Sequence, residues 1–359
     1  MPRARVVRVD PIRPSEEVLE EAAGVLRSGG LVAFPTETVY GLGADAFNSE
    51  AVLKVFRVKR RPLDNPLIVH VSSLDMLHQV AVDVPDWVVR ALSNAWPGPL
   101  TVVLKRRADL PAVVSGGLGT VAVRCPAHPV ALKLIEALGR PVAAPSANLA
   151  GRPSPTRAEH VVEDLGDEID LIIDAGETFF GVESTVVDLV SPRPQILRPG
   201  PVGPEELEKV FGFQFYLTPL TRGFSTYIET PPSPGMKYRH YAPSKKLVLV
   251  EKGSCGFSSY LDFLIDLLRS YSAESPALLA TRETIDEIGM KLGADIAYIA
   301  LGSRENLFEV AKNLYSSLRS LDKLDKISIA FSESIEEKGL GLAIMNRLRK
   351  ASSERLVCK

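Results

Sequence analysis

Short apolar runs alternate along the chain with segments in which apolar residues recur every three or four positions. Runs of this kind are typical of buried strands, and the second pattern is typical of amphipathic helices. The runs predict strands at 31–34, 67–71, 100–104, 121–124, 142–144, 171–173, 185–189 and 195–198. The periodic segments predict helices beginning near Ser15, Ser49, Asp86, Ala131, Thr156 and Pro204. Ser15, Ser49 and Thr156 are expected to cap their helices. Together these elements indicate an α/β fold.

The alternation stops between Phe213 and Pro243, where prolines and glycines indicate a linker, and then restarts. Further strands are predicted at 247–250, 277–280, 296–299 and 327–331, and further helices at 260–268, 283–292, 307–318 and 342–350. Four strands alternating with helices predict a smaller, Rossmann-like parallel sheet. The expected organisation is an N-terminal domain over 1–212, a linker over 213–244 and a C-terminal domain over 245–359.

Polar residues lie beside four of the predicted strands. The run Leu31–Phe34 leads into Pro35–Gly43, which carries hydroxyls, a carboxyl group and glycines. Arg124 ends a second strand, Pro145–Asn148 follow a third, and Glu183–Thr185 adjoin a fourth. Open α/β sheets bind ligands outside their strand ends. We therefore expect these segments to converge on one site for a nucleotide and a small polar acid.

Composition narrows the class of protein. The 359-residue chain has a net charge of −2, which argues against a dedicated nucleic-acid binder but allows a local basic patch. Its three cysteines, Cys125, Cys255 and Cys358, are far apart in the sequence. They predict neither a disulfide framework nor a zinc cluster and fit a reducing cytoplasm. No apolar run approaches the roughly 18 residues of a membrane span. The chain is expected to be cytoplasmic.

Several familiar motifs are absent or incomplete. Gly41–Ala46 matches G-x-G-x-x-A, but a dinucleotide fingerprint opens a helix at once, whereas the next predicted helix begins near Ser49. No P-loop is present, and Ser146 lacks the G-x-S-x-G context of a nucleophile. The histidines show no metal-ligand spacing: His70, His78, His128, His160 and His240. Any metal would arrive as Mg²⁺ on nucleotide phosphates.

Three charged or titratable positions allow two interpretations each. Lys59–Arg61 could be a solvated cluster at a helix C-terminus or a phosphate clamp, to which Asn65 would add an amide donor. His70, within an apolar strand, could be a core residue or a ligand contact. Arg124 needs an anion if it is buried, which could be a protein carboxylate or a substrate carboxylate.

The polar motifs as a set resemble the YrdC-like threonylcarbamoyl-AMP synthase family. They are Pro35-Thr36-Glu37-Thr38-Val39-Tyr40-Gly41-Leu42, Lys59-x-Arg61-Pro62 with Asn65-Pro66-Leu67, Pro145-Ser146-Ala147-Asn148, Glu183-Ser184-Thr185-Val186 and Arg198-Pro199-Gly200. They occur in family order over about residues 10–210. The linker with His240-Tyr241-Ala242-Pro243 and the α/β tail resemble the long, two-domain branch of that family.

The resemblance implies a fold and an activity. The N-terminal domain would be a YrdC-like open twisted α/β domain with a ligand cavity. L-threonine, bicarbonate and ATP would give threonylcarbamoyl-AMP and pyrophosphate, for modification of the adenosine next to the anticodon in tRNA. A downstream tRNA threonylcarbamoyl-transferase complex would be a partner, and direct contact with tRNA is possible.

The resemblance also implies roles for single residues. Threonine would be contacted by Thr38, His70, Arg124, Ala144 and Ser184. ATP would be contacted by Arg61, Asn65, Thr120, Ser146, Asn148, Ser154, Arg198, His240 and Tyr241. Lys59 and Arg61 would be catalytic by offsetting charge that develops on the phosphates. Because positioning and charge stabilisation suffice for this chemistry, no protein nucleophile is expected.

Two rival functions stay open from the sequence. An RNA-binding module without catalysis would show a steep salt dependence of affinity. An accessory module of the kind found in hydrogenase-maturation proteins would be accompanied by acylphosphatase and zinc-finger segments, which this sequence does not contain.

Overall fold

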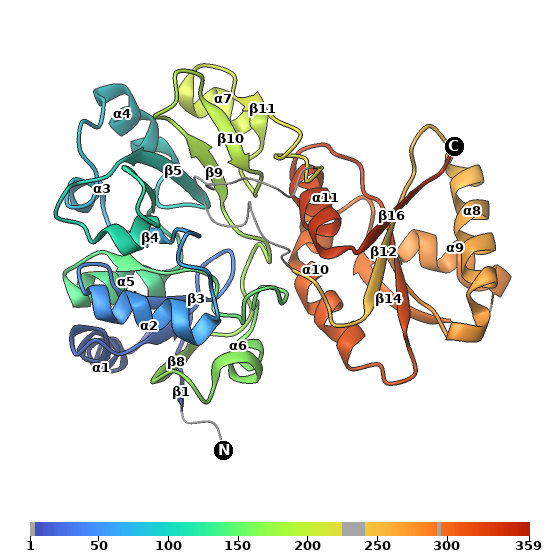
Figure 1. The fold of residues 1–359 in the computed structure, drawn as a ribbon, viewed down its shortest axis with the longest axis horizontal. Helices are drawn as coiled ribbons and strands as arrows, with labels where there is room; N and C mark the ends of the chain where they lie inside the picture. Colours follow the sequence, from blue (N-terminus) through green and yellow to red (C-terminus); the bar gives the residue numbers. More distant parts are fainter. Residues whose placement is uncertain (1–3, 225–240, 293–295) are drawn as a thin grey trace. The chain divides into compact units, whose positions relative to one another are not determined.

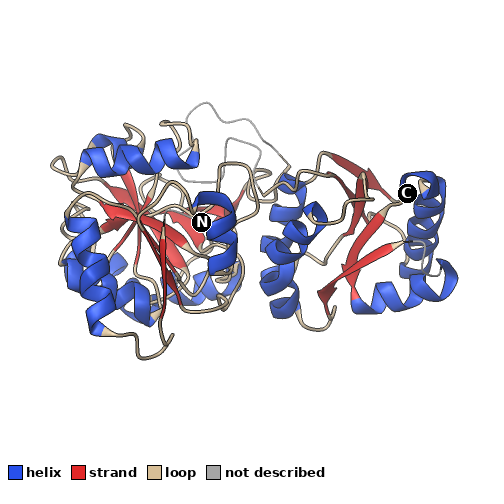
Figure 2. Ribbon diagram, turned by 90° about the horizontal axis from the view of Figure 1, so that it is seen from below, coloured by secondary structure: helices blue, strands red, loops and turns tan. Residues whose placement is uncertain are grey.

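The computed structural model describes residues 4–224, 241–292 and 296–359. Of these, 4–150 and 154–224 form an N-terminal unit, and 151–153 together with 241–292 and 296–359 form a C-terminal unit. The part of the predicted linker from 225 to 240, which includes His240, lies outside the described residues. Each unit has its own sheet and its own helices (Figures 1 and 2).

The N-terminal unit is built on a mixed sheet, which has 11 strands in the described residues, in the order β1-β8-β2-β3-β7-β4-β6-β5-β9-β10-β11. The strands are β1 Arg5–Arg8, β2 Val32–Phe34, β3 Gly41–Asp45, β4 Ile68–His70, β5 Leu100–Lys105, β6 Thr120–Arg124, β7 Val142–Ala143, β8 Leu171–Asp174, β9 Thr185–Asp188, β10 Gln195–Arg198 and β11 Tyr216–Leu217. The central strands are buried on both faces, which explains their unbroken apolar sequences.

Helices surround this sheet. They are α1 Glu16–Arg27, α2 Ser49–Lys59, α3 Leu74–Leu77, α4 Asp86–Ala95, α5 Pro129–Leu138, α6 Ala158–Leu165 and α7 Pro204–Phe211, with a 3₁₀ turn at Ala112–Ser115. Helix α1 packs on α5 and helix α4 on α7 (Figure 1). Their apolar faces join the sheet residues in one hydrophobic core.

Two of the predicted helix caps are wrong by one residue. Ser15 caps α1 as predicted, since its hydroxyl accepts from the Val18 amide at 3.5 Å. Helix α2 is capped by Asn48, whose side chain accepts from the Ala51 amide at 3.1 Å, and Ser49 is already helical. Helix α6 begins after Arg157, not at Thr156. Adjacent Asn and Ser are equally good caps, so only the backbone conformation decides between them.

Strand β3, Gly41–Asp45, corrects a second expectation, because the sequence predicted a polar turn over Pro35–Gly43 and no strand there. The strand pairs antiparallel with β2, with Gly43 opposite Val32. A Cβ atom on Gly43 would lie 2.8 Å from atoms of both Phe34 and Val142, so glycine permits this close approach. Glycine is a weak strand former, which concealed the strand in the sequence.

The C-terminal unit confirms the predicted Rossmann-like parallel sheet and adds a fifth strand. Its order is β14-β13-β15-β12-β16, and all described pairs are parallel. The strands are β12 Lys246–Glu251, β13 Ala277–Thr281, β14 Ala297–Gly302, β15 Ile329–Glu333 and β16 Glu354–Val357. The helices are α8 Phe257–Ser270, α9 Arg282–Leu292, α10 Leu307–Asp322 and α11 Leu340–Ala351, with a 3₁₀ turn at Ser272–Glu274. Helices α8 and α9 cover one face of this sheet, and α10 and α11 cover the other (Figures 1 and 2).

A disulfide in this unit overturns the expectation drawn from cysteine spacing. Cys255 and Cys358 are bonded although they are 103 residues apart in sequence. Strands β12 and β16 are neighbours, and the Cys358 amide donates to the Glu251 carbonyl at 2.9 Å. Sheet pairing brings the two thiols together, and spacing along the chain gave no sign of it. In the part of the chain that is described, no helix is both long and apolar enough to cross a membrane.

Candidate active site

Four of the predicted site residues in the N-terminal unit lie at the two ends of strands β4 and β6. His70 ends β4 and Arg124 ends β6, and the two are register partners. Asn65 precedes β4 and Thr120 begins β6, so both lie at the opposite ends. At about 3.3 Å per residue, strands of this length separate their ends by roughly 10–15 Å. From the roles predicted for them, we call Thr38, His70, Arg124 and Ser184 the amino-acid group, and Lys59, Arg61, Asn65, Ser146 and Asn148 the nucleotide group.

The strand directions that bring these residues together differ from those that the sequence suggested. We expected strand ends to meet at one edge, as in a parallel sheet. Strand β5 instead runs antiparallel to β6 and parallel to β9, so Thr101 at the start of β5 lies opposite Arg124. Ser184 directly precedes β9. The amino-acid group therefore combines the ends of some strands with the beginnings of others.

Arg124 has a protein carboxylate as its partner, which was one of the two alternatives. Its guanidinium is buried, with Nη2 2.7 Å from Glu37 Oε1. Nη1 donates to Thr38 Oγ1 at 2.9 Å and Nε donates to the Gly98 carbonyl at 3.3 Å. These contacts fix the guanidinium plane. A contact with a substrate carboxylate stays a prediction.

Ser184 links the amino-acid group to Arg198. The Ser184 hydroxyl lies 2.8 Å from Thr101 Oγ1 and accepts from Arg198 Nη2 at 3.1 Å. Arg198 Nε donates to the Ser184 carbonyl at 3.1 Å. The structure thus groups Arg198, a predicted ATP contact, with a predicted threonine contact. Its role toward ATP stays a prediction.

His70 is buried but is not a fully satisfied core residue. Its ring meets Phe34 edge-on at 6.3 Å between centroids. Nδ1 has no hydrogen-bond partner among the residues that the structure describes. Burial, together with the positive charge of Arg124, lowers the pKa of His70 to about 3. The imidazole is therefore neutral at physiological pH. Nearby, the Ala144 amide donates to the Ile68 carbonyl at 2.9 Å, which sets Ala144 beside β4.

Lys59 is buried at the end of α2 and contacts the segment that follows β7. Its Nζ donates to the backbone carbonyls of Ser146 and Asn148. The Lys59 carbonyl in turn accepts from the Ala150 amide at 2.9 Å. Lys59 thus holds the Ser146–Asn148 segment in place, and a phosphate contact stays a prediction.

Arg61 is oriented by the loop that leads into β4. Nε donates to the Asn65 carbonyl at 2.9 Å, and Nη2 donates to Asn65 Oδ1 at 2.7 Å and to the Pro66 carbonyl at 2.9 Å. Since Asn65 accepts through its side-chain oxygen, its NH₂ group is the part able to donate to a phosphate. Ser154, another predicted ATP contact, donates to Glu183 Oε1 at 2.6 Å.

Tyr241 belongs to the C-terminal unit. Its ring packs on Tyr315 of α10 with 5.3 Å between centroids, and its φ is 66°. The Arg347 guanidinium lies 5.9 Å from the same ring. The predicted contact of Tyr241 with ATP is not tested by these packing contacts, and His240 lies outside the described residues.

Two residues that contact the amino-acid group were given no role from the sequence. Glu37 pairs with Arg124, and Thr101 bonds with Ser184. The sequence contained a feature that could have identified each of them. Glu37 lies between two threonines in the polar turn, and Thr101 places a hydroxyl in an otherwise apolar strand. Within the described chain, no group of three or more His, Cys, Asp or Glu side chains could hold a metal ion.

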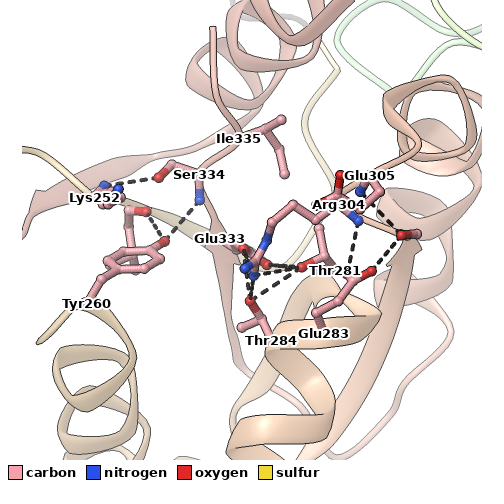
Figure 3. A network of polar contacts seen from close by, with 12 residues as sticks. Lys252, Tyr260, Thr281, Glu283, Thr284, Arg304, Glu305, Glu333, Ser334 and Ile335 are labelled. Atoms are coloured by element: carbon pink, nitrogen blue, oxygen red, sulfur yellow. Dashed lines mark hydrogen bonds and ion pairs between the residues drawn. The ribbon is translucent and has the colours of Figure 1, made fainter. Parts of the chain in front are cut away.

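The C-terminal sheet has polar side chains where parallel sheets bind ligands, between β13 and β15, the point at which the strand order reverses. Glu333 is buried there and accepts from the Thr281 amide at 2.8 Å and from Thr284 Oγ1 at 2.9 Å. Arg304 lies 3.2 Å from Glu333 and donates to Thr284 Oγ1 at 2.6 Å (Figure 3). These groups bond to one another, so we assign no ligand to this network.

Comparison with known proteins identifies the family. A family model described as telomere recombination matches residues 24–200, and one described as threonylcarbamoyl-AMP synthase, C-terminal domain, matches residues 202–353. Threonylcarbamoyl-AMP synthase of Pyrococcus abyssi is 46% identical over 345 residues, covering 96% of this chain and 97% of that protein. The Bacillus subtilis protein of the same name is 42% identical over 349 residues, covering 97% of this chain and 96% of that protein. A crystal structure of P. abyssi Sua5 complexed with L-threonine superposes with a TM-score of 0.91 at 43% identity, over 99% of this chain and 100% of that chain. This chain belongs to the threonylcarbamoyl-AMP synthase family.

Proposed function

We propose that the N-terminal unit forms threonylcarbamoyl-AMP and pyrophosphate from L-threonine, bicarbonate and ATP. The observation that carries this proposal is that one sheet carries two sets of polar side chains with different chemistry. One contains the buried Arg124 and the hydroxyls of Thr38 and Ser184, which suit a hydroxy amino acid. The other contains Arg61 and Asn65, which suit phosphate oxygens. The two halves of the product need two such subsites.

The chemistry requires positioning more than covalent catalysis. The amine of threonine takes up CO₂, supplied by bicarbonate, and loses a proton to give a carbamate. One carbamate oxygen attacks the α-phosphorus of ATP, and the bond to the bridging oxygen breaks as pyrophosphate leaves. Arg61 offsets charge on the phosphates directly, while Lys59 holds the Ser146–Asn148 segment that contacts the nucleotide. Mg²⁺ would arrive with the phosphates.

The direct test is incubation of the full chain with ATP, labelled bicarbonate and a panel of amino acids. We expect a labelled AMP adduct that depends on L-threonine and appears in a one-to-one ratio with pyrophosphate. Pyrophosphate release without an adduct, or an adduct that forms equally with every amino acid, would contradict the proposal.

The partners proposed for this activity are tRNA and the transferase complex that uses the product. A groove of about 760 Å³ along α2 and the residues that follow it supports a tRNA contact. Four basic residues and one acidic residue line it, together with Leu53, Phe56 and Leu63: Lys54, Arg57, Arg60, Arg61 and Glu50. Such a surface suits the phosphate backbone of RNA.

We propose the cytoplasm as the compartment, because ATP and tRNA are used there.

A further inference from the structure

Glu37 is a buried carboxylate whose hydrogen bonds are incomplete. Its side chain is 8% exposed, and that of Arg124 is 4% exposed. Oε1 lies 2.7 Å from Arg124 Nη2, yet within the described residues neither oxygen of Glu37 accepts a hydrogen bond. Nη2 of Arg124 likewise finds no acceptor of suitable geometry there. The ion pair is therefore close in distance but unsatisfied in hydrogen bonding on both sides.

This arrangement is costly as it stands. The desolvation free energy of a buried carboxylate is offset only when an opposite charge pairs with it and its lone pairs accept hydrogen bonds. The nearby donors are engaged elsewhere. The Phe180 amide donates to the backbone carbonyl of Glu37 at 2.8 Å, and the Thr38 hydroxyl bonds with Thr36 at 2.8 Å. The carboxylate keeps its capacity to accept hydrogen bonds, which a ligand with N–H donors would fill.

Two titratable groups beside Arg124, His70 and Cys125, carry no charge at neutral pH. The pKa of His70 is lowered to about 3 by burial and by Arg124, so its ring is neutral. Burial raises the pKa of the Cys125 thiol to about 12, and the charge of Glu37 contributes to this rise. Glu183, a second buried carboxylate beside Ser184, already accepts from Ser154 at 2.6 Å. Glu37 is thus the anion beside Arg124 that has open acceptor positions.

An α-amino acid carries an ammonium and a carboxylate on the same carbon, so it matches an adjacent carboxylate and guanidinium. We propose that Glu37 binds the α-ammonium group of threonine while Arg124 and Thr38 hold its carboxylate. This inference rests on the proposed function and assigns the nitrogen that will become the carbamate to a specific side chain. Glu37 would also exclude hydroxy acids that have the same carboxylate and hydroxyl but no amine.

A different role for Glu37 would be to orient Arg124 without touching the ligand. The two roles differ in which ligands they affect. An orienting residue supports every ligand with a carboxylate, whereas an ammonium receptor supports only ligands with an amino group. The test therefore compares L-threonine with 3-hydroxybutyrate of the same configuration at the hydroxyl carbon, which lacks the amine.

Calorimetric titration of the full chain measures both affinities directly. We expect Glu37→Gln to weaken L-threonine binding at least tenfold and to change 3-hydroxybutyrate binding less than threefold. Equal losses for the two ligands would overturn the proposal and leave an orienting role. The matched control is Asp45→Asn, because Asp45 is also a buried carboxylate, paired with Arg140 at 3.2 Å on the far end of β3. It should bind L-threonine like the wild type.

A second measurement needs no variant. Wild-type affinity for L-threonine should fall about tenfold per pH unit above the ammonium pKa of the free amino acid, because the neutral amine loses its ion pair with Glu37. Affinity that stays constant through this range would refute the ammonium contact. Pyrophosphate release with ATP and threonine reports on the proposed function separately, so the activity can be present even if the Glu37 assignment is wrong.

Discussion

The side chains of Lys59 and Arg61 lie two positions apart in one motif but have different surroundings. Lys59 is buried and bonds to two backbone carbonyls, whereas Arg61 is partly buried and bonds to a loop. The sequence motif predicted that they form one phosphate clamp. The contacts indicate that Lys59 acts by holding Ser146–Asn148 and that Arg61 is the more direct candidate for phosphate binding.

These contacts predict effects on both turnover and stability. Arg61→Ala and Lys59→Met should each slow pyrophosphate release at least tenfold, a loss of about 1.4 kcal/mol in transition-state stabilisation. Both variants should also lower the unfolding temperature: Lys59→Met leaves the carbonyls of Ser146 and Asn148 without this donor, and Arg61→Ala removes the donor from three acceptors in the Asn65–Pro66 loop, each at a cost of about 1–3 kcal/mol. Turnover assays and thermal unfolding of the same preparations measure both. Normal turnover in both variants would rule out a catalytic role for the motif.

His70 predicts a specific dependence of stability on pH. Its pKa is about 3 in the folded chain and 6.5 in the unfolded chain, so the unfolded chain binds the proton more readily. The stabilising effect is complete above pH 6.5 and is lost as the pH falls toward 3. Between these values the free energy of unfolding should decline by up to about 1.4 kcal/mol per pH unit more steeply than in His70→Gln.

Urea unfolding at pH 4.5, 5.5, 6.5 and 7.5 would measure that difference in slope. His78→Gln, at an exposed histidine, is the control and should keep the wild-type slope. Parallel curves for wild type and His70→Gln would mean that His70 is not held neutral. Threonine affinity should show no titration near pH 6.5, because the imidazole remains uncharged there.

At the scale of elements, strands β1, β3, β11 and β16 escaped prediction, and β3 and β16 did so for opposite reasons. Strand β3 contains two glycines and looks like a turn, although it is completely buried. Strand β16 is mostly exposed, so it lacks an apolar run. Pattern reasoning recognises strands by their apolar residues, and it fails where glycine permits close packing or where an edge strand faces water.

Strand β16 is tied to the rest of the C-terminal unit by Cys255–Cys358, which predicts a sensitivity to reduction. A bond closing a loop of this length, 103 residues apart, typically contributes about 2–4 kcal/mol. Reductant should lower the unfolding temperature of the wild type and have no effect on Cys255→Ser/Cys358→Ser. Differential scanning calorimetry with and without reductant tests this. Intact-mass measurement showing two free thiols in protein purified without reductant would contradict the bond.

At the scale of the whole molecule, charge is distributed unevenly. The net charge is −2, yet the groove on α2 has four basic residues and one acidic residue. Net charge alone argued against RNA binding, whereas this local surface supports a tRNA contact. The net charge sums over the whole surface, whereas a binding partner contacts only one face of the protein.

The groove makes the tRNA proposal testable. Arg57→Glu/Arg60→Glu should leave threonylcarbamoyl-AMP formation unchanged without tRNA and weaken tRNA binding. The slope of log affinity against log salt should fall by about one unit for each RNA phosphate that the variant no longer neutralises. Arg13→Glu/Arg90→Glu makes the same change in net charge at other exposed positions and serves as control. Unchanged tRNA binding with weakened binding of the downstream transferase would assign the groove to an acidic protein instead.

Local information in the sequence was enough to predict the family, the two-unit α/β organisation and most of the helices and strands. Those features follow from apolar runs, helical periodicity, caps such as Ser15, and motifs whose letters occur in a fixed order. The family comparison and the parallel C-terminal sheet confirm these predictions. The roles of the individual site residues stay predictions.

The tertiary structure alone decided which polar side chains contact one another. Thr38 and Arg124 bond across 86 residues of sequence, Thr101 and Ser184 across 83, and the cysteine pair across 103. Such contacts depend on strand order and on the direction of neighbouring strands, and a single sequence encodes neither in its periodicity. The pairing of Glu37 with Arg124 has the same cause, because the fold places the end of β6 beside the turn that follows β2.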